Sequence, residues 1–162
     1  AALKAGALDA ALIALPYDMT GLAWAHVEDD ELLAAAPDGH PILRQIRVNP
    51  EDLAPRDLIL LEDGHCLRDH ALAACGLEPP KSTNEETFAA TSLPTLVQMV
   101  GSGLGVSFLP AMAVNAGLTE HVGVTTRPLQ ADHPTREIVV AWRAGSSRAN
   151  EGRMLAEVLR GV

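Results

Sequence analysis

The sequence predicts an α/β fold, because short apolar runs of strand length alternate along the chain with longer stretches of helical character. This order is typical of domains built on parallel strands. The chain has 162 residues, of which 48% are hydrophobic and 20% are charged. That length and composition allow one medium domain or two small lobes with a buried core. The opening AALKAG has the character of the end of a helix, so we expect two lobes, the first of them incomplete.

Each predicted strand is an apolar or β-branched run that ends at turn residues such as Gly, Pro, Asp or Asn. The predicted strands cover residues 8–15, 31–37, 57–62, 87–91, 106–110, 122–129 and 136–143.

The predicted helices cover residues 68–75, 93–103 and 146–162. Gly76 stops the first, as helix C-termini prefer. Ser92 is a good N-cap for the second, and Ser147 lies near the N-cap of the third. Asn49 is expected to cap a short turn. The charged residues of the closing helix indicate a solvated face.

Charge and hydropathy exclude several classes of protein. The net charge is −9 without a cluster of Lys and Arg, whereas a nucleic-acid surface needs a basic stripe. No apolar run approaches the roughly 18 residues of a membrane span. The N-terminal AALKAGALDA lacks the pattern of a signal peptide, so we expect a cytoplasmic protein. The GSGLG segment at 101–105 runs from helix into strand, which favours a structural turn over a phosphate site.

The two cysteines lie in LEDGHCLRDHALAAC, residues 61–75. They are nine positions apart on an expected helix, which separates them by roughly 13 Å along its axis. A disulfide requires Cα atoms within about 7 Å. A bond between Cys66 and Cys75 therefore requires this helix to unwind.

The two thiols are expected to have different surroundings. Cys66 lies where a strand gives way to a helix, and the helix-end amides, His65 and Arg68 favour the reactive thiolate. Asp63 and Asp69 act in the opposite sense. Cys75 is expected on the apolar side of the helix, where a thiol is inert, among Leu72, Ala73, Ala74 and Leu77. This asymmetry suits a sensing and a resolving thiol.

Two other interpretations remain open at this stage. The cysteines could be unrelated buried residues. Alternatively, Cys66 and His70 share a helical face, with His65 and Cys75 nearby, which could hold a metal ion. Zinc sites usually combine close-spaced ligand pairs from two segments, and the sequence shows no second pair.

Three segments resemble the OxyR family of peroxide-sensing LysR-type transcription factors. LEDGHCLRD, with a second cysteine nine residues after the first, is specific to that family. ATSLPTLVQMVGSGLGVSFLPAMAV and EIVVAWRAGS resemble LysR-type effector domains more broadly. The resemblance covers nearly the whole chain.

The resemblance implies that Cys66 is the peroxidatic sensor and Cys75 its resolving partner. It also implies that His65 helps to place peroxide, with Gly64, Arg68 and Asp69 in the surrounding network. It implies hydrogen peroxide and a glutaredoxin- or thioredoxin-type reductant as partners, but no cofactor, metal or membrane. Such regulators are homodimers or homotetramers and activate transcription. They bind DNA through an N-terminal winged helix-turn-helix that this chain lacks.

The family fold is two-lobed and resembles a periplasmic binding protein. It implies that residues 1–29 and 136–162 form what remains of the first lobe. Residues 30–135 then form the second lobe, which carries the cysteines. Two alternatives stay open: a LysR-type effector domain for a small metabolite, and a thiol peroxidase. The resemblance favours a sensor that is not an enzyme.

Overall fold

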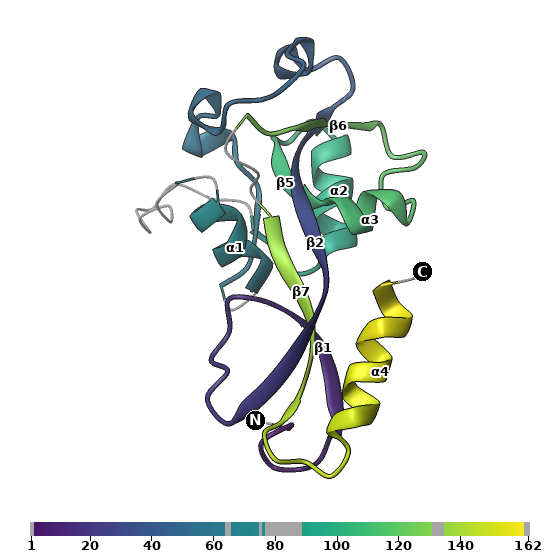
Figure 1. Cartoon of the computed structure of the whole chain (residues 1–162). Helices are drawn as coiled ribbons and strands as arrows, with labels where there is room; N and C mark the ends of the chain where they lie inside the picture. The colour runs from purple at the N-terminus through teal and green to yellow at the C-terminus, as the bar shows by residue number, and fades with distance from the viewer. Residues whose placement is uncertain (1, 64–65, 75, 77–88, 131–134, 161–162) are drawn as a thin grey trace. The chain divides into compact units, whose positions relative to one another are not determined.

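The computed structural model describes residues 2–63, 66–74, 76, 89–130 and 135–160. Helices and strands alternate along much of the chain (Figure 1), which confirms the α/β class. Contacts between Cα atoms divide the chain into two compact units. Unit 1 comprises residues 1–30 and 136–162, and unit 2 comprises residues 31–135. Within the described residues, no helix is long and apolar enough to cross a membrane.

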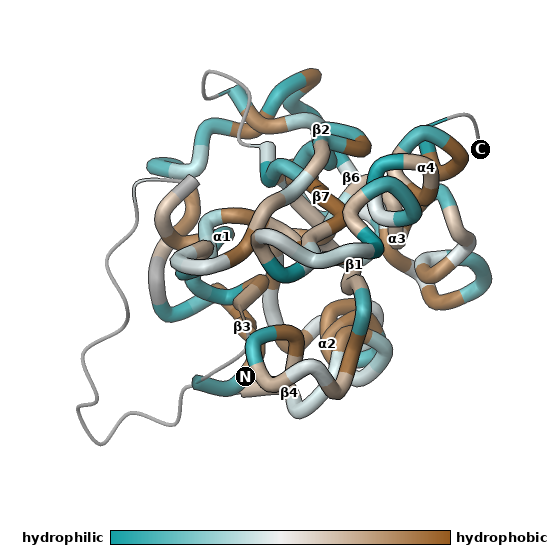
Figure 2. The backbone as a smooth tube through the Cα atoms, turned by 60° about the horizontal axis from the view of Figure 1, so that its bottom comes forward, coloured by the Kyte–Doolittle hydropathy of each residue, from teal (hydrophilic) through white to brown (hydrophobic). Residues whose placement is uncertain are grey.

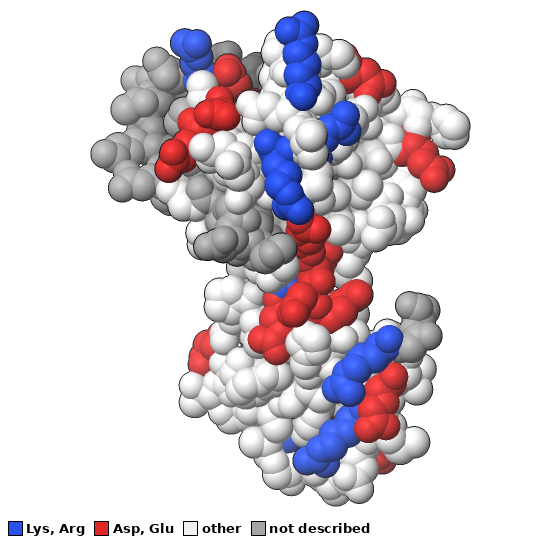
Figure 3. Space-filling model, turned by 45° about the horizontal axis from the view of Figure 1, so that its top comes forward, with Lys and Arg blue, Asp and Glu red and all other residues white. Residues whose placement is uncertain are grey.

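Unit 1 is a small antiparallel arrangement covered by one helix. Strand β1 (Ala10–Ala14) pairs antiparallel with β7 (Thr135–Arg143), and α4 (Ala149–Arg160) follows β7. Gly152 of α4 lies so close to the ring of Trp142 that an added Cβ would be 2.5 Å from it. Glycine therefore allows α4 to pack directly on the strand. Arg and Glu side chains alternate on the exposed side of α4 (Figure 3), as the predicted solvated face requires.

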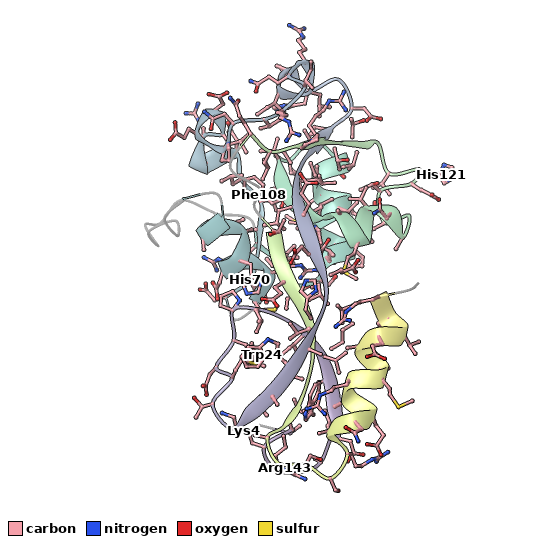
Figure 4. The ribbon with its side chains drawn as sticks, viewed as in Figure 1. Lys4, Trp24, His70, Phe108, His121 and Arg143 are labelled. Carbon is pink, nitrogen blue, oxygen red and sulfur yellow. The ribbon has the colours of Figure 1, made fainter. Side chains whose placement is uncertain are left out.

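Unit 2 contains most of the short elements. In chain order they are η1 (Pro41–Arg44), η2 (Pro50–Asp52), η3 (Pro55–Asp57), β3 (Leu60–Leu61), α1 (Cys66–Ala74), β4 (Ala89–Ala90), α2 (Leu93–Gly101), β5 (Ser107–Pro110), α3 (Ala111–Asn115) and β6 (Val124–Pro128). The apolar α2, brown over much of its length in Figure 2, buries Leu96, Val97 and Val100. They join a core that includes Phe108, labelled on the ribbon in Figure 4.

The expectation of parallel sheets is wrong for the larger sheet. Its strands follow the order β1-β7-β2-β5, with β6 also paired to β2 (Leu22–Pro37). The β1–β7, β2–β5 and β2–β6 ladders are all antiparallel. Among the described residues, parallel pairing is seen in the short β3–β4 ladder and in two isolated bridges. Both β2 and β7 contain residues of both units, so the chain leaves unit 1 along β2 and returns along β7. This return path favours antiparallel neighbours.

Most predicted elements are present, with changed ends. β2 starts at Leu22, nine residues before the predicted strand, and α1 starts at Cys66, two residues before the predicted helix. The side chains of Asn49 and Ser92 accept hydrogen bonds at the starts of η2 and α2, as expected. Before α4, the hydroxyl that accepts a backbone bond belongs to Ser146. α3 was not predicted.

The GSGLG segment is a close-packed turn between α2 and β5. A Cβ on Gly101 would lie 2.2 Å from the carbonyl oxygen of Val122, and one on Gly105 would lie 2.4 Å from that of Asp57. These approaches exclude any side chain. They give both glycines a structural role.

A buried ion pair joins the two strands that carry the chain between the units. The Arg136 Nη2 atom lies 2.7 Å from Asp30 Oδ2, and the Arg136 Nε atom donates to the same oxygen at 2.8 Å. The side chain of Asp30 is 1% exposed and that of Arg136 is 16% exposed. Removing one member of a buried pair is costly because the other charge remains in a dry site.

We therefore expect Arg136→Met to lower the free energy of unfolding by about 3–5 kcal/mol, measured by urea denaturation. Arg148→Met is the matched control, because Arg148 pairs with Asp9 at an exposed site. Exposed pairs contribute only about 0–1 kcal/mol. Equal losses in the two variants would contradict the assigned role of the buried pair.

Candidate functional site

Helix α1 presents one face to solvent and the opposite face to the core of unit 2. Cys66, Asp69 and Ala73 are exposed, at the i, i+3, i+7 spacing of a single helical face. Leu67 and Ala71 belong to the main core cluster, and Leu72 is also buried. Packing against the core therefore fixes the rotation of α1 and directs Cys66 outward.

Cys66 is the first residue of α1, and its thiol is free and exposed. The strand-to-helix junction predicted around it is present, since β3 ends at Leu61. Just after β3, the Glu62 N–H donates to the Ala90 carbonyl at 3.1 Å, which ties the chain at Glu62 to β4. Cys66 thus starts α1 on the solvent-facing side of the helix.

Arg68 forms an ion pair with Asp63, through Nη1 and Oδ1. The Arg68 side chain is only 12% exposed, whereas that of Asp63 is 92% exposed. Arg68 was expected to support a thiolate at Cys66, with Asp63 acting against it. The structure instead joins the two residues to each other, so the charge of Arg68 is compensated. The sequence offered one signal of this pairing, an acid and a base five positions apart across the start of a helix.

The other predicted site residues are placed as follows. Asp69 lies on the exposed face of α1 together with Cys66. Gly64, His65 and Cys75 lie outside the described residues, so their predicted roles remain predictions. Ala73, expected on the apolar side near Cys75, is exposed.

The alternative metal site receives no support from the described residues. His70 is buried, on the stretch of α1 labelled in Figure 4, whereas Cys66 is exposed. In the part of the chain that the structure describes, no group of three or more His, Cys, Asp or Glu side chains is placed to hold a metal ion. His65 and Cys75, the other two candidate ligands, fall outside it.

The family model for the LysR substrate binding domain matches residues 1–162. The chain belongs to this family. It is similar to the "Probable hydrogen peroxide-inducible genes activator" of Mycobacterium leprae, with 39% identity over 98% of the chain and 50% of that protein. It is also similar to the DNA-binding transcriptional dual regulator OxyR of Escherichia coli, with 37% identity over 99% of the chain and 52% of that protein. The chain thus spans about half the length of these relatives.

Solved structures agree with the sequence relatives. The reduced regulatory domain of OxyR2 from Vibrio vulnificus matches with a TM-score of 0.86 and 35% identity, covering 99% of this chain and 74% of that one. The reduced OxyR regulatory domain from Pseudomonas aeruginosa matches with a TM-score of 0.82 and 34% identity, covering 99% and 76%. These matches confirm the resemblance to the OxyR family and the two-lobed fold of its regulatory domains.

Because the Cys66 thiol is exposed, we expect a maleimide to label it completely without denaturant. Cys75→Ser removes the second thiol, so labelling of this variant measured by mass spectrometry reports on Cys66 alone. The rate under native conditions is expected to be close to that in urea. Strong protection in the native state would contradict the solvent-facing position of Cys66.

Proposed function

We propose that this chain is the regulatory domain of a hydrogen-peroxide-responsive transcription factor. Cys66 is the sensor in this proposal, and Cys75 resolves it to a reversible disulfide. The observation that carries the proposal is the exposed, free Cys66 at the first residue of α1, in a chain similar to peroxide-inducible activators. In this proposal Gly64, His65, Arg68 and Asp69 are neighbours of the peroxide site, as the family resemblance implies.

The length of α1 supports a switch. From Cys66 to Ala74 the helix spans nine residues, or about 12 Å between the terminal Cα atoms. Consecutive Cα atoms are 3.8 Å apart. While α1 is intact, a residue bonded to Ala74 therefore keeps its Cα at least about 8 Å from that of Cys66. This exceeds the roughly 7 Å limit of a disulfide, so the bond requires α1 to unwind.

The chemistry proceeds in two balanced steps. The Cys66 thiolate attacks one peroxide oxygen; an S–O bond forms, the O–O bond breaks, and the departing hydroxide takes a proton to become water. The Cys75 thiolate then attacks the sulfenic sulfur of Cys66. An S–S bond forms, the S–O bond breaks, and the departing hydroxide takes a proton to become a second water. A glutaredoxin- or thioredoxin-type dithiol reverses this oxidation by thiol–disulfide exchange.

Unwinding α1 couples this chemistry to the rest of the protein. Leu67 and Leu72 are buried in the reduced fold, and exposing such side chains costs roughly 1.5–3 kcal/mol each. A bistable segment of this kind can repack a contact between subunits. We infer that oxidation thereby changes the homodimer or homotetramer of the full-length protein and its DNA binding.

The remaining parts of the proposal follow the family. Unit 1 corresponds to the first lobe, expected at residues 1–29 and 136–162, and unit 2 to the second, expected at 30–135. DNA is bound through a winged helix-turn-helix outside this chain, in the bacterial cytoplasm. In this proposal the protein is a peroxide sensor and a transcriptional activator. It is not a peroxidase.

Peroxide is expected to convert the wild-type chain to a Cys66–Cys75 disulfide. Cys66→Ser should abolish the reaction, because it removes the attacking thiolate, whereas Cys75→Ser should stop at a sulfenic acid on Cys66. Dimedone trapping followed by peptide mass spectrometry measures both outcomes. Equal dimedone labelling of the two single variants would rule out the assigned roles.

A sensor and a thiol peroxidase differ in turnover. A sensor should consume about one equivalent of peroxide per chain when oxidised to a single disulfide, whereas a peroxidase consumes many equivalents when a dithiol is supplied. Peroxide loss is measured first without reductant, where about one equivalent per chain is expected. It is then measured with excess dithiothreitol, after correction for the reagent alone, where a sensor is re-reduced by the dithiol and turns over only slowly. Rapid consumption that continues over many equivalents would favour the enzyme.

A further inference from the structure

We propose that the Asp63–Arg68 ion pair controls the second step of this reaction, the closure of the disulfide, by holding the first turn of α1 to the end of β3. This inference rests on the proposed redox function. It assigns positioning roles to Asp63 and Arg68, which act through the backbone around Cys66.

The ion pair closes a short loop of chain that contains Cys66. On one side of the loop, Asp63 directly follows Glu62, whose N–H is bonded to the Ala90 carbonyl. On the other side, Arg68 lies in the first turn of α1 and its side chain is largely buried. The guanidinium–carboxylate contact therefore connects a fixed strand end to the start of the helix.

Closing the disulfide must separate these two attachments. Cys66 can approach the thiol beyond the far end of α1 only if the helix unwinds, because the intact helix holds the two positions too far apart. Unwinding takes Arg68 out of the first turn, so the contact with Asp63 is lost on the way. Peroxide attack on Cys66 has no such requirement, since the thiol is already exposed. The ion pair should thus slow disulfide closure. It should not restrain the earlier attack of Cys66 on peroxide.

The size of the effect follows from the exposure of the pair. Asp63 is 92% exposed, and pairs with an exposed member contribute little and are weakened by salt. We expect Asp63→Asn and Arg68→Gln each to accelerate disulfide closure by roughly twofold to fivefold at low salt. Arg68→Lys keeps the charge and should restore much of the slow rate of closure.

The two variants also separate a mechanical effect from an electrostatic one. Asp63→Asn makes the surroundings of Cys66 more positive, whereas Arg68→Gln makes them more negative. A purely electrostatic influence on the sulfur would change the rate in opposite directions in the two variants. Loss of the Asp63–Arg68 ion pair would instead raise the rate of disulfide closure in both variants. Glu62→Gln is the matched control, because it removes an equal exposed charge from the adjacent position without altering the ion pair.

The experiment uses the 162-residue chain and stopped-flow mixing with hydrogen peroxide. The concentration-dependent phase reports sulfenic acid formation, and the concentration-independent phase reports disulfide closure. We expect only Asp63→Asn and Arg68→Gln to close faster. In the wild type and the Glu62→Gln control, added salt should accelerate disulfide closure, because salt weakens the ion pair. In Asp63→Asn and Arg68→Gln, which lack the ion pair, added salt should not accelerate closure.

Two results would overturn the inference while leaving the proposed function intact: equal closure rates in all variants, or opposite shifts in Asp63→Asn and Arg68→Gln. A wild-type chain that forms no Cys66–Cys75 disulfide would instead overturn the proposed function itself. Urea denaturation of each reduced variant shows whether a changed rate merely follows a change in global stability.

Discussion

The packing of α1 against the core of unit 2 is the contact on which the proposed switch depends. Leu67 and Ala71 share one cluster with Leu96, Val100 and Phe108. This contact turns Cys66 outward and keeps the helix formed, although helices this short are marginal on their own in water. The same burial that exposes the thiol of Cys66, the proposed sensor, therefore also keeps α1 formed, and an intact α1 prevents the proposed disulfide. The exposure of Cys66 and the persistence of α1 thus both follow from the packing of this helix against the core.

The ion pairs of the chain illustrate two different uses of charge. Asp30 and Arg136 form a buried ion pair at the boundary of unit 1, where β2 leaves it and β7 returns. A buried pair is costly to break, so it holds these two strands together permanently. Asp63 and Arg68 pair with one member almost fully in water, and such pairs contribute little to stability. A weak, screened contact is suited to a segment that must open during a reaction. The two pairs thus separate the permanent part of the fold from the part proposed to rearrange.

The sequence predicted the elements whose signals are local. Capping by Asn49 and Ser92 and the turn at GSGLG were predicted correctly, because each depends on residues within a few positions. The first half of β2 was missed because the acidic run from Glu28 to Glu31 masks its alternation, and its place in the sheet comes from pairing with β7. The antiparallel ladders were missed for a related reason, since strand direction depends on the path of the whole chain.

At the site, the position of Cys66 could be predicted from the helix pattern. The contact of Arg68 with Asp63 could not be predicted, because it depends on how the chain brings Asp63 to the start of α1 and not on a local helix pattern.

The marginal stability of α1 also explains how one chemical event can change a whole segment. Helix formation is cooperative, so a short helix that loses its first turn loses the nucleus on which the remaining hydrogen bonds depend. α1 is also stabilised by the burial of Leu67, Ala71 and Leu72, and Leu67 lies in the first turn, next to Cys66. Once Cys66 is drawn away from that turn, Leu67 leaves the core and the cost of keeping Ala71 and Leu72 in place rises. The segment is then expected to have two states, packed as a helix or released, with few stable intermediates. A sensor needs this property, because a graded loosening of α1 would give the rest of the protein no distinct oxidised state to recognise.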